Sequence, residues 1–227
     1  MSELFSIQLQ NRQQQGRDGV WLDLPTTTEQ VQAALRQIGI SSDNPQGLFI
    51  SGYFAEEEKR FAIPYNMVLA SNVDELNFLA SRLETLSTGE RAELNAALQA
   101  PQSELFSIGR ITDFPENVDY YVHLPDVHGP AQLGDYYLNR SGMVDMPEEW
   151  KGGIDTAQFG RYVAQQEQGV FTQYGYLVKS GDEWQKVHEG QPVPEEYRVL
   201  SFPAPEVLRD SANIPPPVQP ETEPQKV

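Results

Sequence analysis

The segment Asn72-Val73-Asp74-Glu75-Leu76-Asn77-Phe78-Leu79-Ala80-Ser81-Arg82-Leu83-Glu84-Thr85-Leu86 is the clearest fold signal in the chain. Its leucines share one face at helical spacing: Leu76, Leu79, Leu83 and Leu86. Asn72 can cap the helix, and Asp74 and Glu75 suit the positive end of its dipole. We therefore predict a helix over 73–86. A second helix over 91–100, ended by Pro101, completes a helical hairpin.

The residues before this hairpin alternate between strand and helix patterns. Period-two alternation predicts strands over 5–9, 19–24 and 48–53. Helical spacing predicts a helix over 29–38, with a threonine before it as cap and Gly39 after it. This order is typical of a small α+β unit, and we assign it residues 1–72.

The residues after the hairpin mix short strands, short helices and turns. Strands are predicted over 118–123, 169–178 and 197–202, and helices over 133–138 and 156–166. We expect a mainly helical middle domain over 73–125 and an α+β C-terminal domain over 126–205. The proline-rich acidic tail, 206–227, has too few apolar groups to order itself and is predicted to be disordered. The predicted fold class is α+β.

The composition restricts the function before any motif is considered. The 227 residues include 33 acidic and 16 basic side chains, a formal net charge of −17. Nucleic acid and anionic membranes would repel such a chain, so a basic protein surface is the natural partner. The absence of cysteine excludes disulfides, cysteine-bound metals and thiol nucleophiles. With neither a secretory leader nor a membrane span in the sequence, we expect a cytoplasmic protein.

The negative charge is concentrated in residues 113–150. This stretch contains one basic residue, Arg140, and eight acidic residues: Asp113, Glu116, Asp119, Asp126, Asp135, Asp145, Glu148 and Glu149. Outlying acids are Glu56, Glu57, Glu58, Asp74 and Glu75. Isolated carboxylates separated by apolar residues could take the place of DNA phosphates in a basic groove. Charge alone nevertheless favours the plainer interpretation, a solvated acidic face that keeps the protein soluble.

No catalytic, metal or cofactor motif accompanies these acids. The sequence has no nucleophile elbow, no dinucleotide fingerprint and no phosphate-binding loop. His123 and His128 are separated by four residues in a Pro/Gly-containing loop. This spacing is not a recognised metal-ligand motif, so we do not expect the two histidines to bind a metal. We therefore predict no catalytic residues, no metal and no cofactor. The tryptophans Trp21, Trp150 and Trp184 are expected to anchor cores.

Several segments in the same order resemble the ArdA antirestriction family. They are Trp21-Leu22-Asp23-Leu24-Pro25, Ile38-Gly39-Ile40, Phe49-Ile50-Ser51-Gly52-Tyr53, Asn72-Val73-Asp74-Glu75-Leu76-Asn77-Phe78-Leu79-Ala80, Asn117-Val118-Asp119-Tyr120-Tyr121, Leu133-Gly134-Asp135-Tyr136-Tyr137-Leu138, Phe159-Gly160-Arg161 and Phe171-Thr172-Gln173-Tyr174-Gly175-Tyr176. The resemblance covers about residues 4–180. It implies an elongated, three-domain, homodimeric protein without an active site, carried by mobile elements such as conjugative transposons.

The resemblance also implies a mechanism and a partner. Surface carboxylates would imitate the phosphates of B-form DNA and occupy the DNA groove of a type I restriction–modification enzyme, formed by its methyltransferase and specificity subunits. The acids of 113–150, with the outlying ones, would be the phosphate surrogates. Two features depart from the family: five bases in 151–205, and additions at residues 181–194 and in the tail.

Three other interpretations stay open at the level of sequence. The chain could be a DNA mimic aimed at another nucleic-acid-targeting defence system, such as CRISPR. It could be an acidic interaction module that uses its proline-rich tail as a ligand. It could also be an acidic enzyme, which would need a deep pocket with a perturbed carboxylate pair.

Overall fold

The three strands predicted at the N-terminus are confirmed, and they form an antiparallel sheet of order β2-β1-β3. Its strands are β1 (Phe5–Asn11), β2 (Val20–Leu24) and β3 (Leu48–Phe54). Helix α1 (Thr28–Gln37) begins at a capping box between Thr27 and Gln30. The computed structural model describes residues 3–14, 18–41, 46–56, 61–101 and 103–200.

The predicted helical hairpin is confirmed as α3 (Val73–Glu84) and α4 (Thr88–Gln99). Leu76, Leu79 and Leu83 are fully buried, as the apolar stripe requires. Helix α4 begins three residues earlier than expected because Ser87 and Glu90 form a capping box. Two short helices that the periodicity did not indicate flank the hairpin, α2 (Tyr65–Ala70) and α5 (Ile108–Thr112).

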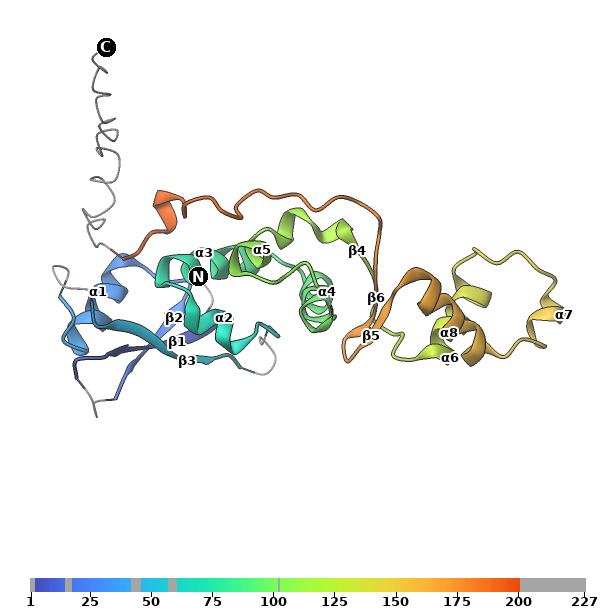
Figure 1. The fold of residues 1–227 in the computed structure, drawn as a ribbon, viewed down its shortest axis with the longest axis horizontal. Coiled ribbons are helices and arrows are strands. Elements are labelled where there is room, and N and C mark those ends of the chain that lie inside the picture. Colours follow the sequence, from blue (N-terminus) through green and yellow to red (C-terminus); the bar gives the residue numbers. More distant parts are fainter. Residues whose placement is uncertain (1–2, 15–17, 42–45, 57–60, 102, 201–227) are drawn as a thin grey trace, which may run out of the picture.

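A second antiparallel sheet, of order β4-β6-β5, lies at the middle of the elongated molecule (Figure 1). It contains β4 (Tyr121–Leu124), β5 (Val170–Thr172) and β6 (Gly175–Lys179). The predicted strand over 118–123 is only partly correct, because short 3₁₀ helices η2 (Phe114–Glu116) and η3 (Val118–Tyr120) precede β4. We call this sheet the junction sheet and the described residues 3–120 the first lobe.

Residues 125–169 form what we call the outer lobe. It contains α6 (Pro130–Asp135), which continues as the π-helical turn η4 (Tyr136–Arg140), then α7 (Glu148–Lys151) and α8 (Thr156–Glu167). Helices α6 and α8 touch through glycines: a Cβ on Gly160 would lie 1.8 Å from the Pro130 carbonyl oxygen. A Cβ on Gly134 would lie 2.0 Å from the Thr156 carbonyl oxygen. The two backbones can approach this closely only because both positions lack a side chain.

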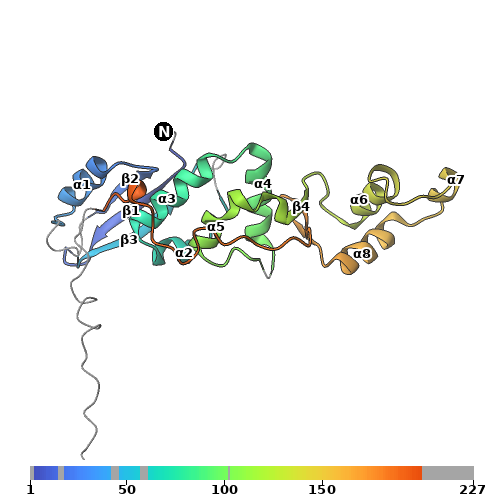
Figure 2. The same ribbon diagram turned by 90° about the horizontal axis from the view of Figure 1, so that it is seen from above.

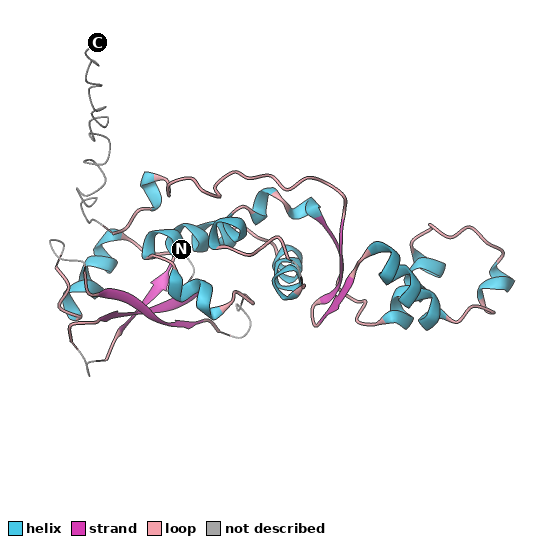
Figure 3. Cartoon of the chain, viewed as in Figure 1, coloured by secondary structure: helices cyan, strands magenta, loops and turns pink. Residues whose placement is uncertain are grey.

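After β6 the chain turns back and runs along the first lobe (Figures 1 and 2). We call residues 180–200 the return segment. It contains only the 3₁₀ turn η5 (Glu195–Tyr197) and is otherwise irregular, as the loop-coloured ribbon in Figure 3 shows. The predicted strand over 197–202 is wrong for residues 197–200. The amides of Val199 and Leu200 bind a side-chain carboxylate instead of a neighbouring strand.

Two hydrophobic clusters divide the described residues. The larger one extends from Leu4 through the hairpin to Val199. The smaller one belongs to the outer lobe and centres on Val127, Leu133 and Tyr176. Adjacent residues of β6 point to opposite sides, Tyr176 into the smaller cluster and Leu177 into the larger. The three-domain division stays a prediction, and the tail from 206 lies outside the described residues.

The tryptophans do not all anchor cores. Trp21 is 51% exposed and Trp150 is 66% exposed, so the expectation is wrong for both. Trp184 is partly buried and packs edge-to-face on Tyr120, with ring centroids 5.1 Å apart. The size of the Trp21 side chain does not determine its burial. Trp21 lies on the outward face of a strand whose buried side is formed by Leu22 and Leu24.

Candidate partner-binding surface

Four of the predicted carboxylates are exposed and carry no counter-charge. Asp119 belongs to η3 of the first lobe, and Asp126, Asp145 and Glu149 belong to the outer lobe. Within the part of the chain that the structure describes, none of the four has an ion pair or hydrogen bond from its side chain. Their charges are therefore available to a partner protein.

Three more predicted acids are balanced by bases of the chain itself. Glu116 pairs with Arg82. Glu148 pairs with Lys151 at 2.9 Å between carboxylate and ammonium. Asp135 accepts hydrogen bonds from Asn139 and Arg140, each at 2.8 Å, and these hold the pKa of Asp135 below its usual range. These carboxylates offer a partner less net charge than the unpaired ones.

Asp113 is not a surface carboxylate. Its exposed fraction is 0%, which corrects the expectation that it faces a partner. The carboxylate accepts three backbone N–H groups of the return segment, from Val187 at 3.3 Å, His188 at 2.6 Å and Glu189 at 3.2 Å. A buried charge is stable here because three donors satisfy it. The sequence could not reveal this role, because the donors lie about 75 residues further along the chain.

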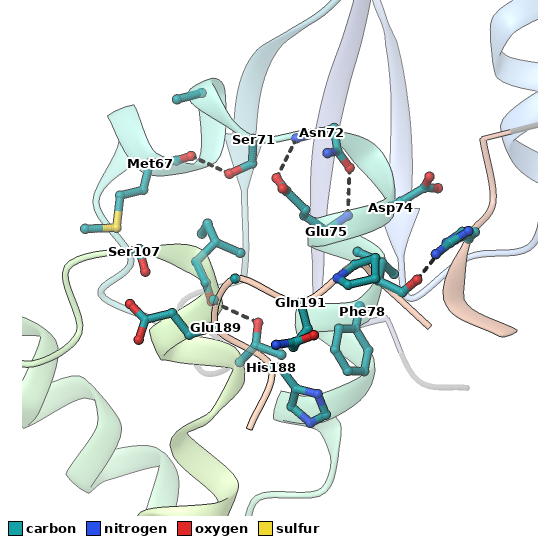
Figure 4. Close-up of a pocket in the computed structure, with 18 residues that line it drawn as sticks. Met67, Ser71, Asn72, Asp74, Glu75, Phe78, Ser107, His188, Glu189 and Gln191 are labelled. Atoms are coloured by element: carbon teal, nitrogen blue, oxygen red, sulfur yellow. Dashed lines mark hydrogen bonds between the residues drawn. The ribbon is translucent and has the colours of Figure 1, made fainter. Parts of the chain in front are cut away.

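The outlying acids have mixed surroundings. Asp74 accepts the backbone N–H groups of Val199 at 2.7 Å and Leu200 at 2.8 Å. Glu75 closes the capping box of α3 by accepting the Asn72 amide at 3.2 Å (Figure 4). Glu56 is exposed at the end of β3. Glu57 and Glu58 lie outside the described residues.

The return segment adds exposed acids to those predicted for the surface. Asp182, Glu183, Glu195 and Glu196 are exposed along the first lobe. Five acids and two bases occur in residues 180–200. Their density was visible in the sequence, but their position beside α3 and α5 depends on contacts at Asp113 and Asp74.

A groove of about 790 Å³ separates the return segment from α2, α3 and α5 (Figure 4). Its acidic wall contains Asp74, Glu75 and Glu189, and its one lining base is Arg198. The His188 ring stands edge-to-face on Phe78, with centroids 4.9 Å apart. Asp74 accepts two backbone N–H groups of the return segment and Glu75 accepts one from Asn72, so both carboxylates have structural roles in this groove.

The histidines take part in packing and backbone contacts. Nε2 of His123 lies 2.7 Å from the Tyr174 carbonyl oxygen, and His188 packs on Phe78. Among the described residues no group of three His, Asp or Glu side chains is arranged to hold a metal ion. No helix in the same ranges is long and apolar enough to cross a membrane.

Comparison with known families supplies the identity. The sequence model of the family described as antirestriction protein (ArdA) matches residues 15–178, most of the 227-residue chain. The chain belongs to the ArdA antirestriction family. This confirms the resemblance seen in the motifs, and the family's function is antirestriction. No individual curated protein shows significant similarity to the chain.

The ArdA match covers the outer lobe, the first lobe except its N-terminal residues with β1, and most of the junction sheet. It ends within β6, so the return segment lies beyond it. The two carboxylates that hold the return segment, Asp74 and Asp113, lie inside the matched region. In this ArdA-family chain they receive backbone amides from residues that the match does not include.

Proposed function

We propose that this ArdA-family protein inhibits type I restriction–modification enzymes by occupying their DNA-binding groove as a mimic of B-form DNA. The observation that carries the proposal is the set of exposed, unpaired carboxylates on an elongated molecule (Figure 1). Such an inhibitor protects incoming mobile DNA without catalysis, because each inhibitor molecule blocks the DNA-binding groove that it occupies.

Electrostatics explains why carboxylates on an elongated surface can replace DNA. Duplex DNA carries one negative charge for about every 1.7 Å of its axis, and a groove that binds it is lined with Lys and Arg. A folded chain of net charge −17 offers the same sign of charge on a preformed surface. Because the carboxylates are fixed by the fold, little ordering entropy opposes their binding.

The surface that we propose consists mainly of acids free of partners. Its main members are Asp119, Asp126, Asp145 and Glu149. Glu116, Asp135 and Glu148 are secondary members because Arg82, Arg140 and Lys151 offset their charge, and Glu56 is a further secondary member. Asp113 is excluded by its burial, and Asp74 and Glu75 act through the fold. The exposed acids of the return segment extend the surface along the first lobe.

We further propose that the active form is a homodimer that pairs through the outer lobe. Three large apolar side chains are exposed there: Met143 at 75%, Trp150 at 66% and Tyr162 at 60%. Large exposed apolar and aromatic side chains are enriched at interfaces between protein chains. Light scattering of the purified protein measures the oligomeric state, and a monomer at micromolar concentration would contradict this part of the proposal.

The deciding experiment is competition with DNA. The full chain is added to a purified type I restriction–modification enzyme bound to labelled target DNA, at about 0.05 M and about 0.5 M NaCl. We expect stoichiometric displacement of DNA at low salt and a large loss of displacement at high salt, because ion pairs are screened. Equal displacement at both salt concentrations would rule out charge mimicry. No displacement at low salt would exclude this class of target.

A further inference from the structure

The first lobe carries an exposed aromatic pair on its N-terminal sheet. Trp21 on β2 is 51% exposed and Phe54 at the end of β3 is 54% exposed. Helices α1 and α3 lie on one side of this sheet, and Figure 1 shows no helix over the other. Large exposed aromatic side chains are enriched at protein interfaces, where they contribute much of the binding energy.

Strand register places the pair on one face. Gln8 lies opposite both Trp21 and Gly52, and Ser6 lies opposite both Asp23 and Phe54. Residues directly opposite in an antiparallel sheet point to the same side. Phe5, Ile7 and Leu9 of β1 point to the buried side, so these two rungs form the outward face.

The Trp21 ring is held in position before any partner arrives. It packs edge-to-face with Phe54, with ring centroids 6.4 Å apart and an interplanar angle of 74°. A Cβ on Gly52 would lie 3.1 Å from Cη2 of Trp21, so the ring occupies the space of the missing side chain. Gly52 does not have a positive φ, so its backbone does not require glycine. The glycine makes room for the ring.

A carboxylate stands beside the aromatic pair. Asp23 is exposed on the same face as Trp21, and its Oδ1 accepts a hydrogen bond from Ser6 Oγ at 2.6 Å. Among the described residues, no basic side chain forms an ion pair with Asp23. No cation in the same residues lies over the rings of Trp21 or Phe54. By contrast, the guanidinium of Arg110 already covers the exposed ring of Phe106, 4.8 Å from its centroid.

An aromatic face next to a carboxylate is suited to a guanidinium group. Arginine can stack on the ring and donate hydrogen bonds to the carboxylate at the same time, which the compact ammonium of lysine does less well. The net charge of −17 repels nucleic acid, so a nucleobase is excluded as the group that stacks on these rings. The complementary occupant is a positively charged segment of a protein.

We propose that the outward face of the N-terminal sheet, at Trp21, Phe54 and Asp23, binds an arginine-bearing segment of the enzyme that the protein inhibits. This proposal rests on the proposed function, because the enzyme's basic groove supplies the arginine. It adds a contact that phosphate mimicry does not include. The acids supply attraction that is weakened by salt, whereas this face supplies an aromatic contact that salt affects much less.

The first test compares variants in the competition experiment. We expect Trp21→Ala to weaken displacement of DNA about tenfold without changing its salt dependence, and Asp23→Asn to weaken it less. Gly52→Ala keeps the tryptophan but crowds its ring and the neighbouring Gln8, so a shift of a few tenths of an ångström is needed, and it should weaken displacement less than Trp21→Ala. Phe106→Ala is the matched control, an exposed aromatic whose face is already occupied. Equal displacement by wild type, Trp21→Ala and Gly52→Ala would overturn the proposal and leave the inhibitory function standing.

A second test does not depend on the target enzyme. Fluorescence anisotropy measures the binding of labelled deca-arginine and deca-lysine to the full chain. We expect wild type and Phe106→Ala to prefer deca-arginine, and Trp21→Ala to lose that preference while its circular dichroism is unchanged. If wild type fails to displace DNA, the proposed inhibitory function is wrong. The preference for deca-arginine then still tests whether the outward face binds arginine. An identical preference for deca-arginine in wild type and Trp21→Ala would refute the proposed arginine-binding face.

Discussion

The Asp113 carboxylate accepts the backbone N–H of His188 at 2.6 Å, although 75 residues separate the two in the chain. The same carboxylate also accepts the amides of Val187 and Glu189. Together with Asp74 at its far end, Asp113 fastens the return segment to the first lobe through main-chain groups. An acid that the charge pattern favours as a phosphate surrogate is therefore part of the scaffold.

Removing the Asp113 carboxylate should destabilise the protein strongly. Asp113→Ala leaves three amides of the return segment without their acceptor, and we expect a loss of about 3 kcal/mol in the free energy of unfolding. Urea denaturation measures this loss. Asp126→Ala, at an exposed and unpaired acid, is the control and should stay within about 0.5 kcal/mol of wild type. Similar losses in the two variants would contradict a structural role for Asp113.

Asp74 should protect the end of the return segment from hydrogen exchange. Its Oδ1 binds the amides of Val199 and Leu200, so Asp74→Ala should raise their exchange rates about tenfold or more. Hydrogen exchange followed by NMR reads both amides directly. Glu195→Ala, at an exposed acid of the same segment, should leave both rates unchanged. Unaltered rates in Asp74→Ala would show that other contacts hold this end.

Glu93 should make stability depend on pH. Burial, followed by the charges of Glu90 and Asp119, raises the pKa of Glu93 to about 8. A carboxyl whose pKa is higher in the folded state favours folding while it is protonated, and that contribution declines as pH rises from about 4.5 towards 8. Glu93→Gln stays neutral, so its advantage over wild type should be greater at pH 8.5 than at pH 5. Thermal unfolding at both pH values checks this, and an advantage that does not change with pH would contradict the raised pKa.

The close contact of α6 and α8 should not tolerate side chains at its glycines. Gly160→Ala places a Cβ against the Pro130 carbonyl and should cost about 3 kcal/mol or more in the packing of the outer lobe. Limited proteolysis should then cleave the outer lobe first. Gly89→Ala is the matched control, because nothing lies within 4 Å of its Cβ, and it should stabilise α4 by about 0.5–1 kcal/mol. Resistance of Gly160→Ala to protease would argue against this contact.

Neutralising the unpaired acids should abolish inhibition gradually. We expect each single change among Asp119→Asn, Asp126→Asn, Asp145→Asn and Glu149→Gln to weaken displacement of DNA about two- to threefold. The four together should weaken it more than about 30-fold and flatten the salt dependence. Unchanged circular dichroism confirms that the fold persists. Full activity of the quadruple variant would remove these acids from the proposed surface.

Local patterns predicted most of the elements because they depend on neighbours in the chain. Alternation marked β1, β2 and β3, and the leucine stripe with its Asn72 cap marked α3. The conformation of the return segment could not be predicted from local patterns, because its backbone N–H groups donate to the carboxylates of Asp74 on α3 and of Asp113. Trp21 was assigned to the core on its size, whereas its place on the strand decides its exposure.

The sequence by itself determined the acidic character of the protein, its α+β class and its membership of the ArdA family, since composition, periodicity and motifs are carried by residues close together in the chain. Only the tertiary structure decided which carboxylates are exposed and unpaired. Burial and hydrogen bonding arise from residues far apart: Asp113 satisfies amides of the return segment, whereas Asp126 has no partner among the described residues. The same charge in the sequence therefore serves the fold in one case and, as we propose, recognition in the other.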